Sequence, residues 1–415
     1  MRINTPLLVV VVALSIALSY YLHNPMVSAP LVGLKYSDVV YGVFSTRFNP
    51  GDPSLWFNTG KLEELKSGRR LCPIPYVDYK FEYPPLIALL FLISTCTGFM
   101  LVLPQSYPPS EYSLLIERVT QVHYNIQALA LITAFLVTVV LVVVLSREFN
   151  LESWRYILLP ILPSTIVYTI YNWDIISSAF LLAGVLFYLR RRYMLAGVLT
   201  GLSISTKLLT FLAGIALAVR LVALGEREGF KSYITAFLAF SIIPYAVVYL
   251  VTPQGFLAFV NHHSRWYCEN CIYMILEGDI WSPLHRVAAT LVIGLTSIIV
   301  LFLSTRRDVR VDQLLLLATS TPIIFNYVFT PQMILLITPI AILTLSNRSL
   351  ALYSLADILN ALIIISFFEE LLARGNPWTL EGVTQKIAMA RNLVLLILWV
   401  HLVFKIMKSS RVLSE

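Results

Sequence analysis

Long apolar stretches, separated by short polar or basic clusters, run through nearly the whole chain. The first extends from Pro6 to Leu22, directly after Arg2, and no small-residue cleavage site follows it. Several stretches approach the roughly 20 residues with which a helix crosses about 30 Å of hydrocarbon. They do not alternate in polarity, which excludes a porin-like barrel. The pattern predicts an all-α, polytopic transmembrane bundle in which residues 1–415 form a single domain.

The composition supports this assignment. Of the 415 residues, 58% are apolar and 13% are charged, whereas roughly a quarter of the residues of soluble proteins are charged. The mean hydropathy is +0.78. The net charge is +7, but the basic residues lie in short clusters between apolar stretches. Clusters of this kind set the orientation of a membrane protein, and we expect no nucleic-acid partner.

The basic clusters predict the orientation of each span, because short loops rich in Lys and Arg stay in the cytoplasm. The clearest are Arg190–Arg192, Arg220–Lys231, Arg306–Arg310 and Lys405–Arg411. Alternation between them predicts about twelve crossings in the cell membrane, with both termini cytoplasmic. The predicted crossings are 6–22, 123–145, 156–171, 174–189, 193–206, 208–224, 232–251, 285–304, 314–329, 333–346, 349–368 and 387–407.

The apolar stretch 86–103 begins and ends on the outer side in this scheme, so we expect it to be re-entrant or to lie at the interface. The predicted outer side also receives two longer polar regions, the first outer segment 24–85 and the second outer loop 252–284. We expect these two regions to cap a cavity that contains the active site.

Three pairs of short spans meet at polar residues on the same predicted outer side. The junctions are Asn172–Asp174, Lys207 and Thr330–Gln332. Broken helices are tolerated at membrane depth only where protein or a water-filled cavity covers the backbone. The convergence of the three junctions therefore predicts a functional site at this end of the bundle.

Two aspartates are candidates for catalysis. Asp38 follows the first span, and its alternative role is a helix N-cap or a solvated loop acid. Asp174 lies between two apolar stretches, where an ionisable group is costly and by default suggests a functional site. Its alternative role is to cap the helix that begins at Ile175, because Asp is a preferred N-cap residue.

Lys207 is flanked by apolar stretches, and its ammonium either snorkels to the interface or binds a phosphate that approaches from the bilayer. Arg265, His262 and His263 in the second outer loop would supply further phosphate donors. Adjacent histidines on a helix point about 100° apart, so these two do not form a metal site by themselves. We expect no metal and no other cofactor.

The four cysteines are too few for a disulfide framework. Cys268 and Cys271 form a CxxC motif in the second outer loop, and zinc would need about two more ligands than that loop clearly supplies. A local disulfide or two free thiols are the expected states.

Taken in order, these motifs resemble the GT-C integral membrane glycosyltransferases. They are most similar to the polyprenol-phosphate-mannose-dependent mannosyltransferases of glycosyltransferase family 87. The resemblance runs from about residue 36 to 340 and rests on Asp38 after the first span, Tyr83-Pro84-Pro85, Asn172-Trp173-Asp174, the run Ala196–Gly201 before Lys207-Leu208, the His and Arg residues of the second outer loop, and Phe329-Thr330-Pro331-Gln332.

The resemblance implies that a hexose, with mannose as the first candidate, moves from a polyprenyl (dolichyl-type) monophosphate to an acceptor on the outer face, with inversion. The acceptor would be a glycolipid, a glycan or a protein. Asp38 would be the general base, with Asp174 in the same cavity, and Lys207 and Arg265 would hold the lipid phosphate. Such a donor needs no Gly-rich phosphate loop, and we find none.

The resemblance also implies that Glu82 and Tyr83 border the acceptor groove, with Gln332 nearby. Two positions depart from the family pattern. Ser37 precedes Asp38 where many relatives have a second acid, and Met333 follows Gln332 where an aromatic residue is common.

The alternative function is a transporter or flippase of a lipid-linked or anionic substrate. Transporters of this kind bind substrate at broken helices near the midplane and are often built from two repeats. We see no convincing repeat between the halves of the sequence, and the polar junctions gather at one face. Both observations favour the transferase.

Overall fold

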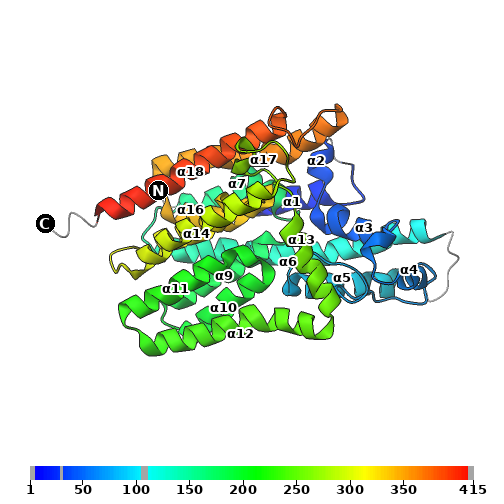
Figure 1. Cartoon of the computed structure of the whole chain (residues 1–415), viewed down its shortest axis with the longest axis horizontal. Helices are drawn as coiled ribbons and strands as arrows, with labels where there is room; N and C mark the ends of the chain where they lie inside the picture. The colour runs from blue at the N-terminus through cyan, green and yellow to red at the C-terminus, as the bar shows by residue number, and fades with distance from the viewer. Residues whose placement is uncertain (1–4, 29–30, 104–110, 410–415) are drawn as a thin grey trace.

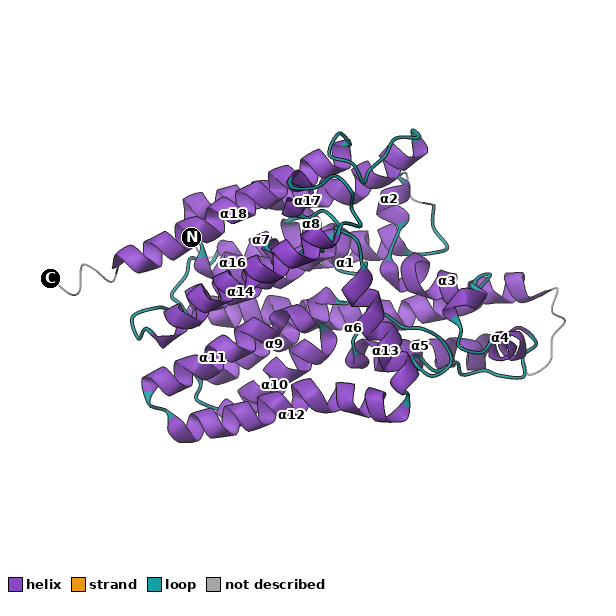
Figure 2. Ribbon diagram, in the orientation of Figure 1, coloured by secondary structure: helices purple, strands orange, loops and turns teal. Residues whose placement is uncertain are grey.

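The computed structural model describes residues 5–28, 31–103 and 111–409 (Figure 1). In this part of the chain the regular structure consists of helices, with isolated β-bridges and no β-strand, as Figure 2 shows. The all-α prediction is confirmed. Arg2, which precedes the first predicted span, and Arg411, the last residue of the predicted basic cluster Lys405–Arg411, lie outside the described residues.

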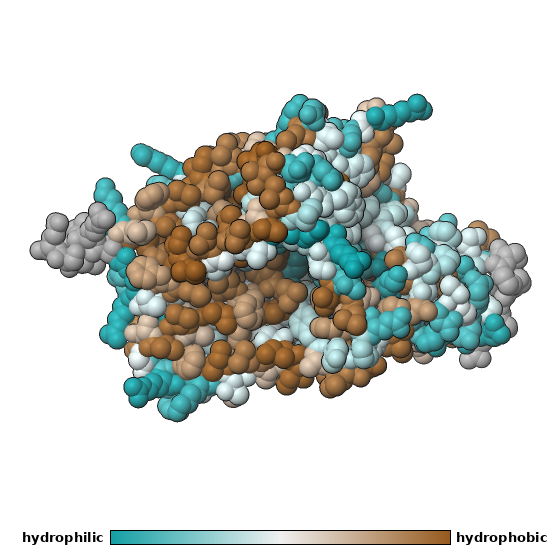
Figure 3. Space-filling model, in the orientation of Figure 1, coloured by the Kyte–Doolittle hydropathy of each residue, from teal (hydrophilic) through white to brown (hydrophobic). Residues whose placement is uncertain are grey.

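Seven helices in the described ranges are long and apolar enough to cross a membrane. They are α1 (Thr5–His23), α5 (Pro85–Val102), α6 (Tyr112–Glu148), α12 (Arg227–Val251), α14 (Pro283–Thr305), α17 (Asn347–Leu372) and α18 (Val383–Ser409). Apolar side chains cover most of the bundle surface on the face drawn in Figure 3, and hydrophilic side chains gather at its ends. The chain is therefore a multi-pass membrane protein.

Shorter apolar helices pack among the long ones. They are α9 (Asp174–Leu189), α10 (Tyr193–Thr206), α11 (Phe211–Leu224), α15 (Val311–Ile324) and α16 (Ile334–Thr344). Helices of this length reach only about 15–25 Å, less than the hydrocarbon thickness. One end of α9, α10 and α16 lies within the bundle, where Asp174, Thr206 and Ile334 are buried.

The predicted span 156–171 is broken in the structure. It forms α7 (Arg155–Ile161) and α8 (Pro163–Tyr168), because Pro163 lacks the N–H that would continue α7. The next free N–H, that of Ser164, donates to Asp357 Oδ2 at 3.0 Å. Asp357 on α17 thus accepts a hydrogen bond from a backbone N–H that the break leaves without a partner in the helix.

The predicted span 314–329 is also shorter than expected. α15 ends at Ile324, and Val328 then forms a parallel β-bridge with Glu269. The chain leaves the helix here because its backbone pairs with the second outer loop.

The first outer segment folds into short elements at one end of the bundle, beside α13 (Pro253–Arg265), as Figure 1 shows. The beginning of α1 and the end of α18 lie at the opposite end. The short elements are α2 (Val32–Lys35), the π-helix η1 (Asp38–Ser45), α3 (Thr46–Phe48), η2 (Pro53–Leu55) and α4 (Thr59–Lys66).

The stretch 86–103 forms α5, one continuous helix, so it does not turn back on itself as a re-entrant segment would. It packs against α6, α10 and α12. The rings of Phe48 and Phe99 lie 5.4 Å apart, and a disulfide joins Cys72 to Cys96. α5 is also one of the seven helices that are long and apolar enough to cross a membrane, so the interfacial alternative stays a prediction. The Cys72–Cys96 bridge itself is not predicted from the sequence.

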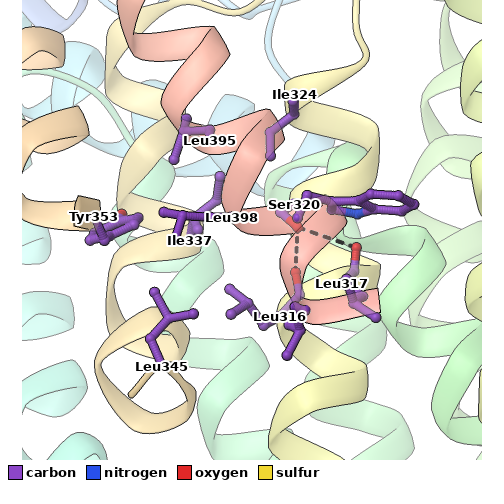
Figure 4. Close-up of a pocket in the computed structure, with 11 residues that line it drawn as sticks. Leu316, Leu317, Ser320, Ile324, Ile337, Leu345, Tyr353, Leu395 and Leu398 are labelled. Carbon is purple, nitrogen blue, oxygen red and sulfur yellow. Dashed lines mark hydrogen bonds between the residues drawn. The ribbon is translucent and has the colours of Figure 1, made fainter. Parts of the chain in front are cut away.

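A small apolar cavity of about 20 Å³ lies where α15, α16, α17 and α18 meet (Figure 4). Most of the side chains that surround it are leucine and isoleucine. The Ser320 hydroxyl donates a hydrogen bond to the carbonyl of Leu316 at 2.5 Å. Such a void has room for no more than about one water molecule. It is a packing feature of the core.

Candidate active site

A cavity of about 490 Å³ lies at the end of the bundle that carries the first outer segment. In Figure 3 the surface is hollowed near the end of α13, where apolar and hydrophilic areas meet. The polar and charged residues that line the cavity include Tyr36, Asp38, Glu82, Tyr83, Asn172, Lys207, His262, His263, Glu269, Asn270, Thr330 and Gln332. The three polar junctions of the sequence therefore meet in one cavity, together with both outer regions.

Asp38 is the first residue of the π-helix η1, and Ser37 caps that helix by accepting a hydrogen bond from the N–H of Val40 at 3.3 Å. The N–H groups of Asp38 and Val39 both donate to the carbonyl of Tyr171, at 3.0 and 3.4 Å. This connection fixes the start of η1 against the turn that precedes α9. The N-cap role considered for Asp38 belongs to Ser37.

The Asp38 carboxylate is held mainly through one oxygen. Oδ2 accepts hydrogen bonds from Asn172 Nδ2 at 2.5 Å, from the Tyr83 hydroxyl at 3.0 Å and from Gln332 Nε2 at 3.3 Å. Burial raises the pKa of Asp38 to about 6, against the opposing effect of the Asn172 and Tyr83 hydrogen bonds and of Lys207. The group is thus ionised at neutral pH and more basic than an ordinary aspartate.

Oδ1 of Asp38 lies on the other side, beside the Tyr36 hydroxyl and the backbone of Gly42. A Cβ at Gly42 would come within 2.9 Å of Oδ1 and 2.8 Å of the Tyr36 oxygen. Glycine is therefore required where the first turn of η1 passes the carboxylate. A carboxylate oxygen has two lone pairs, so Oδ1 retains capacity to accept a proton.

Lys207 ends α10 and forms an ion pair with Asp174, with Nζ 2.8 Å from Oδ1. The Lys207 side chain lines the cavity, whereas Asp174 is 1% exposed and does not. Asp174 therefore lies behind Lys207 as its charge partner. The ammonium has three donors, and this pair uses one of them.

Glu82 and Tyr83 line the cavity at the end of the first outer segment. Glu82 forms an ion pair with Arg47, whose side chain is almost completely buried. The Glu82 carbonyl also lies 2.8 Å from Nε2 of His263. The first outer segment is thereby joined to α13 across the cavity.

Of the three residues at the end of α13 that are predicted to bind phosphate, two line the cavity and one does not. His262 and His263 line the cavity, and the centres of the His262 and Trp266 rings lie 4.5 Å apart with the rings tilted by 36°. Burial lowers the pKa of His262 to about 4, so it is a neutral hydrogen-bonding group at pH 7. Arg265 lies on the exposed face of the helix with Asn261 and is not part of the lining.

Glu269 lines the cavity and is not among the residues predicted from the sequence. It lies inside the Cys268–Cys271 disulfide loop, and its Oε2 accepts a hydrogen bond from Trp266 Nε1 at 2.7 Å. Burial raises the pKa of Glu269 to about 7. The local disulfide is one of the two expected cysteine states.

The wall formed by α17 is apolar and contains Ile363, Ile364, Phe367 and Phe368. Leu208, next to Lys207, also lines the cavity and is 44% exposed. The cavity thus combines hydrocarbon surface with a polar floor. Among the described residues, no three His, Cys, Asp or Glu side chains come together in an arrangement that would hold a metal ion.

Comparison with known proteins does not assign the chain to a family. No family model matches the sequence, and no curated protein matches it. Among solved structures, the chain is similar to the crystal structure of ArnT from Cupriavidus metallidurans bound to undecaprenyl phosphate. The TM-score is 0.46 at 14% sequence identity, over 98% of this chain and 78% of that chain. Likeness at this level does not establish a common fold, so the functional argument rests on the cavity.

Proposed function

We propose that the protein is an integral membrane glycosyltransferase of the GT-C type. It transfers a hexose, with mannose as the first candidate, from a polyprenyl monophosphate to an acceptor hydroxyl. The observation that carries this proposal is the shared cavity of Asp38 and Lys207. The Asp38 carboxylate can accept a proton, and the Lys207 ammonium can bind a phosphate. Both side chains line one cavity, which is also bordered by apolar residues.

In the proposed reaction, Asp38 removes the proton from the acceptor hydroxyl as that oxygen bonds to the anomeric carbon. The bond between the anomeric carbon and the phosphate oxygen breaks, and the polyprenyl phosphate leaves with the bonding electrons. The two events occur on opposite faces of the sugar, so the configuration inverts. General base catalysis of this kind contributes about 10²- to 10⁴-fold to the rate.

Lys207 would stabilise the negative charge that grows on the departing phosphate. Its ammonium is fixed by Asp174 before the reaction begins, and such preorganised donors are worth more in a partly dehydrated site than in water. His262 and His263 would add neutral donors. Arg265, which lies outside the cavity lining, would bind phosphate only at the mouth of the cavity.

The apolar residues beside the polar floor suit a lipid-linked donor. Leu208 lines the cavity next to Lys207 and is partly exposed, so an isoprenoid chain that lies against it could remain in the bilayer while its phosphate reaches Lys207. Both disulfides lie in the regions that border the cavity. Disulfides persist in oxidising compartments, which supports an active site on the outer face of the cell membrane.

The test is transfer of radiolabelled mannose from polyprenyl-phosphate-mannose by the purified protein in vesicles that contain native lipid extract. We expect a labelled glycolipid, glycan or protein product. The Asp38→Asn variant, which keeps the shape of the side chain, should lose about 10²- to 10⁴-fold in rate while it still binds donor.

Substantial transfer by Asp38→Asn would remove Asp38 from the mechanism. Absence of transfer from mannosyl, other hexosyl and pentosyl polyprenyl phosphates would refute the transferase and turn attention to transport.

A further inference from the structure

Glu269 is a charged residue of the cavity that the proposed reaction leaves without a role. Its Oε2 is engaged by Trp266 Nε1. In the described structure no hydrogen bond engages Oε1, which belongs to a residue lining the cavity. One carboxylate oxygen is thus oriented by protein and the other is available to a ligand.

The backbone of Glu269 is fixed from two directions. Its N–H donates to the carbonyl of Tyr327 at 3.0 Å, and its carbonyl accepts from the N–H of Phe329 at 2.8 Å. The Cys268–Cys271 disulfide closes the loop around it. A side chain on backbone held in this way is preorganised for recognition.

The next residue, Asn270, is held by the last helix. Its carbonyl accepts hydrogen bonds from Arg391 Nη2 at 3.2 Å and from Asn392 Nδ2 at 2.8 Å. Asn270 also has a positive φ of 52°, a conformation that Asn tolerates better than most residues. The short loop is therefore fixed on both sides of Glu269.

The position of Glu269 relative to the other charges identifies the part of the substrate that it faces. It is close enough to both Asp38 and Lys207 to interact electrostatically with each. In the proposed reaction the donor sugar lies between the phosphate at Lys207 and the acceptor oxygen at Asp38. Glu269 therefore borders the space of the donor sugar.

The chemical surroundings of Glu269 also suit a sugar. Trp266, Tyr267 and His262 line the cavity beside it, and the rings of Trp266 and Tyr267 lie 5.1 Å apart. Aromatic surfaces offer apolar contact to the C–H face of a pyranose, and a carboxylate accepts hydrogen bonds from its hydroxyls. A fixed carboxylate on an aromatic surface is a means of selecting one hydroxyl arrangement over another.

We propose that Glu269 determines sugar specificity by accepting a hydrogen bond from a ring hydroxyl of the donor hexose, and that the Cys268–Cys271 disulfide holds it in place. This inference rests on the proposed function. It assigns Glu269 to the donor sugar and not to the acceptor, and it gives the CxxC motif a positioning role instead of a metal.

The experiment compares donors that lack one hydroxyl at a time. Mono-deoxy analogues of the accepted polyprenyl-phosphate hexose are assayed with the wild-type protein and with Glu269→Ala. Removing the hydroxyl that Glu269 binds should lower kcat/KM of the wild type about 10- to 100-fold, as expected for a hydrogen bond to a charged group. The same analogue should cost Glu269→Ala almost nothing, because its partner is already missing.

Matched variants separate this role from a general structural effect. Glu277→Gln removes a negative charge from an exposed position in the same loop and should keep the wild-type sensitivity to every deoxy donor. Cys268→Ala/Cys271→Ala should lose much of that sensitivity. Cys72→Ala/Cys96→Ala, which removes the other disulfide, should retain it.

The outcomes distinguish the two levels of the argument. Wild-type transfer with equal deoxy penalties in wild type and Glu269→Ala would overturn the role of Glu269 and leave the transferase standing. A penalty that depends on Glu269 only for deoxy acceptors would likewise overturn the assignment to the donor. Failure of the wild type to transfer from any donor would refute both proposals.

Discussion

Lys207 and Asp174 have the same kind of position in the sequence but different locations in the structure. Both stand at junctions between apolar stretches, and both are expected in the cavity. In the structure Lys207 lines the cavity, whereas Asp174 lies behind it, with Asp174 Oδ1 2.8 Å from Lys207 Nζ. Asp174 is therefore a positioning residue in the proposed mechanism. A buried acid that neutralises a cation also determines what happens when the cation is removed.

Replacing Lys207 by Met should destabilise the protein, because Asp174 would remain buried without its partner, a loss of about 3–5 kcal/mol. The double variant Lys207→Met/Asp174→Asn removes both charges and should recover most of the thermal stability. Donor binding should stay at least about tenfold weaker in both variants, since a phosphate contact is lost. Thermal unfolding and donor binding of the purified variants measure the two effects separately.

Wild-type donor affinity in the double variant would mean that Lys207 serves the fold and not the phosphate. In that case the snorkelling role considered from the sequence would be the better description.

The pKa of Asp38 predicts the acid limb of the pH profile. Burial raises this pKa to about 6, and only the deprotonated carboxylate acts as a base. The value of kcat/KM should therefore fall as pH drops through about 6 and lose about tenfold per unit below it.

Glu269, whose pKa burial raises to about 7, can add a second inflection to this profile. The Glu269→Gln variant should lose that inflection and keep the one at about 6. A profile of kcat/KM that stays flat through pH 6 in both proteins would contradict the general-base role of Asp38.

At the level of single residues, sequence reasoning found much of the cavity and missed one part of it. Asp38, Lys207 and Gln332 each flank an apolar stretch, and a polar residue at such a boundary is conspicuous. Glu269 stands in a polar loop where acids are common, so its burial depends on pairing with Tyr327 and Phe329 far along the chain. An acid between two cysteines of one motif is the signal that would have directed attention to it.

The element that carries Asp38 is a π-helix, a rare form that is frequently found at functional sites. Its wider turn brings Gly42 beside the carboxylate, where a Cβ has no room. The sequence shows the glycine but gives no indication of this geometry, because π-helices have no distinct hydrophobic period. The helical span that precedes it, in contrast, follows from its apolar run.

Gly42→Ala should lower kcat about 10²-fold, because the added methyl group displaces Oδ1 of Asp38 or the Tyr36 hydroxyl, and misplacement by about 1 Å has effects of this size. Gly294→Ala is the matched control, since no atom lies within 4 Å of a Cβ at that position on α14. Initial-rate kinetics of the two variants provide the comparison. Equal rates would show that the carboxylate position is not critical.

The end of α13 shows why helix phase matters for site prediction. His262 and Trp266 are four residues apart and share the face that contacts the cavity, whereas Arg265 lies on the exposed face. A basic residue in the correct loop is therefore not sufficient to predict a cavity contact. The phase could have been read from the positions of Phe259 and His262, had the helix boundaries been known.

For the whole molecule, apolar run length predicts the helical bundle and most of its spans. It does not predict where a span breaks. At the break before Pro163, the free N–H of Ser164 finds its hydrogen-bond acceptor in Asp357, nearly 200 residues later. The pairing of Val328 with Glu269 is likewise a long-range event. The cavity as a whole depends on such contacts, which bring together segments from seven regions of the chain.

Arg391 on α18 connects several of these regions. It is completely buried, its guanidinium lies 3.6 Å from the centre of the Phe329 ring, and it donates to Asn360 Oδ1 at 2.8 Å and to the carbonyls of Asn270 and Phe329. The last helix thus fastens both loops that supply Glu269 and Gln332. Its contribution to the site is entirely through these neighbours.

Arg391→Met should lower the thermal stability of the protein and also the deoxy-donor sensitivity of the proposed reaction. Each buried acceptor left without a partner costs about 1–3 kcal/mol, and the loops that it anchors lose a fixed position. Arg348→Met, at an exposed position on α17, should change neither property. Thermal unfolding and the deoxy-donor assay together test the prediction, and an unchanged donor sensitivity would limit Arg391 to a stabilising role.

The attachment of both loops to α18 has a consequence for biosynthesis. The ribosome delivers Asp38 and Lys207 to the membrane long before it reaches residue 391. Until that residue is inserted, Asn270 and Phe329 lack the contacts that fix their loops. A nascent or truncated chain that lacks residue 391 would therefore hold an unfinished cavity, although Asp38 and Lys207 are already present in it.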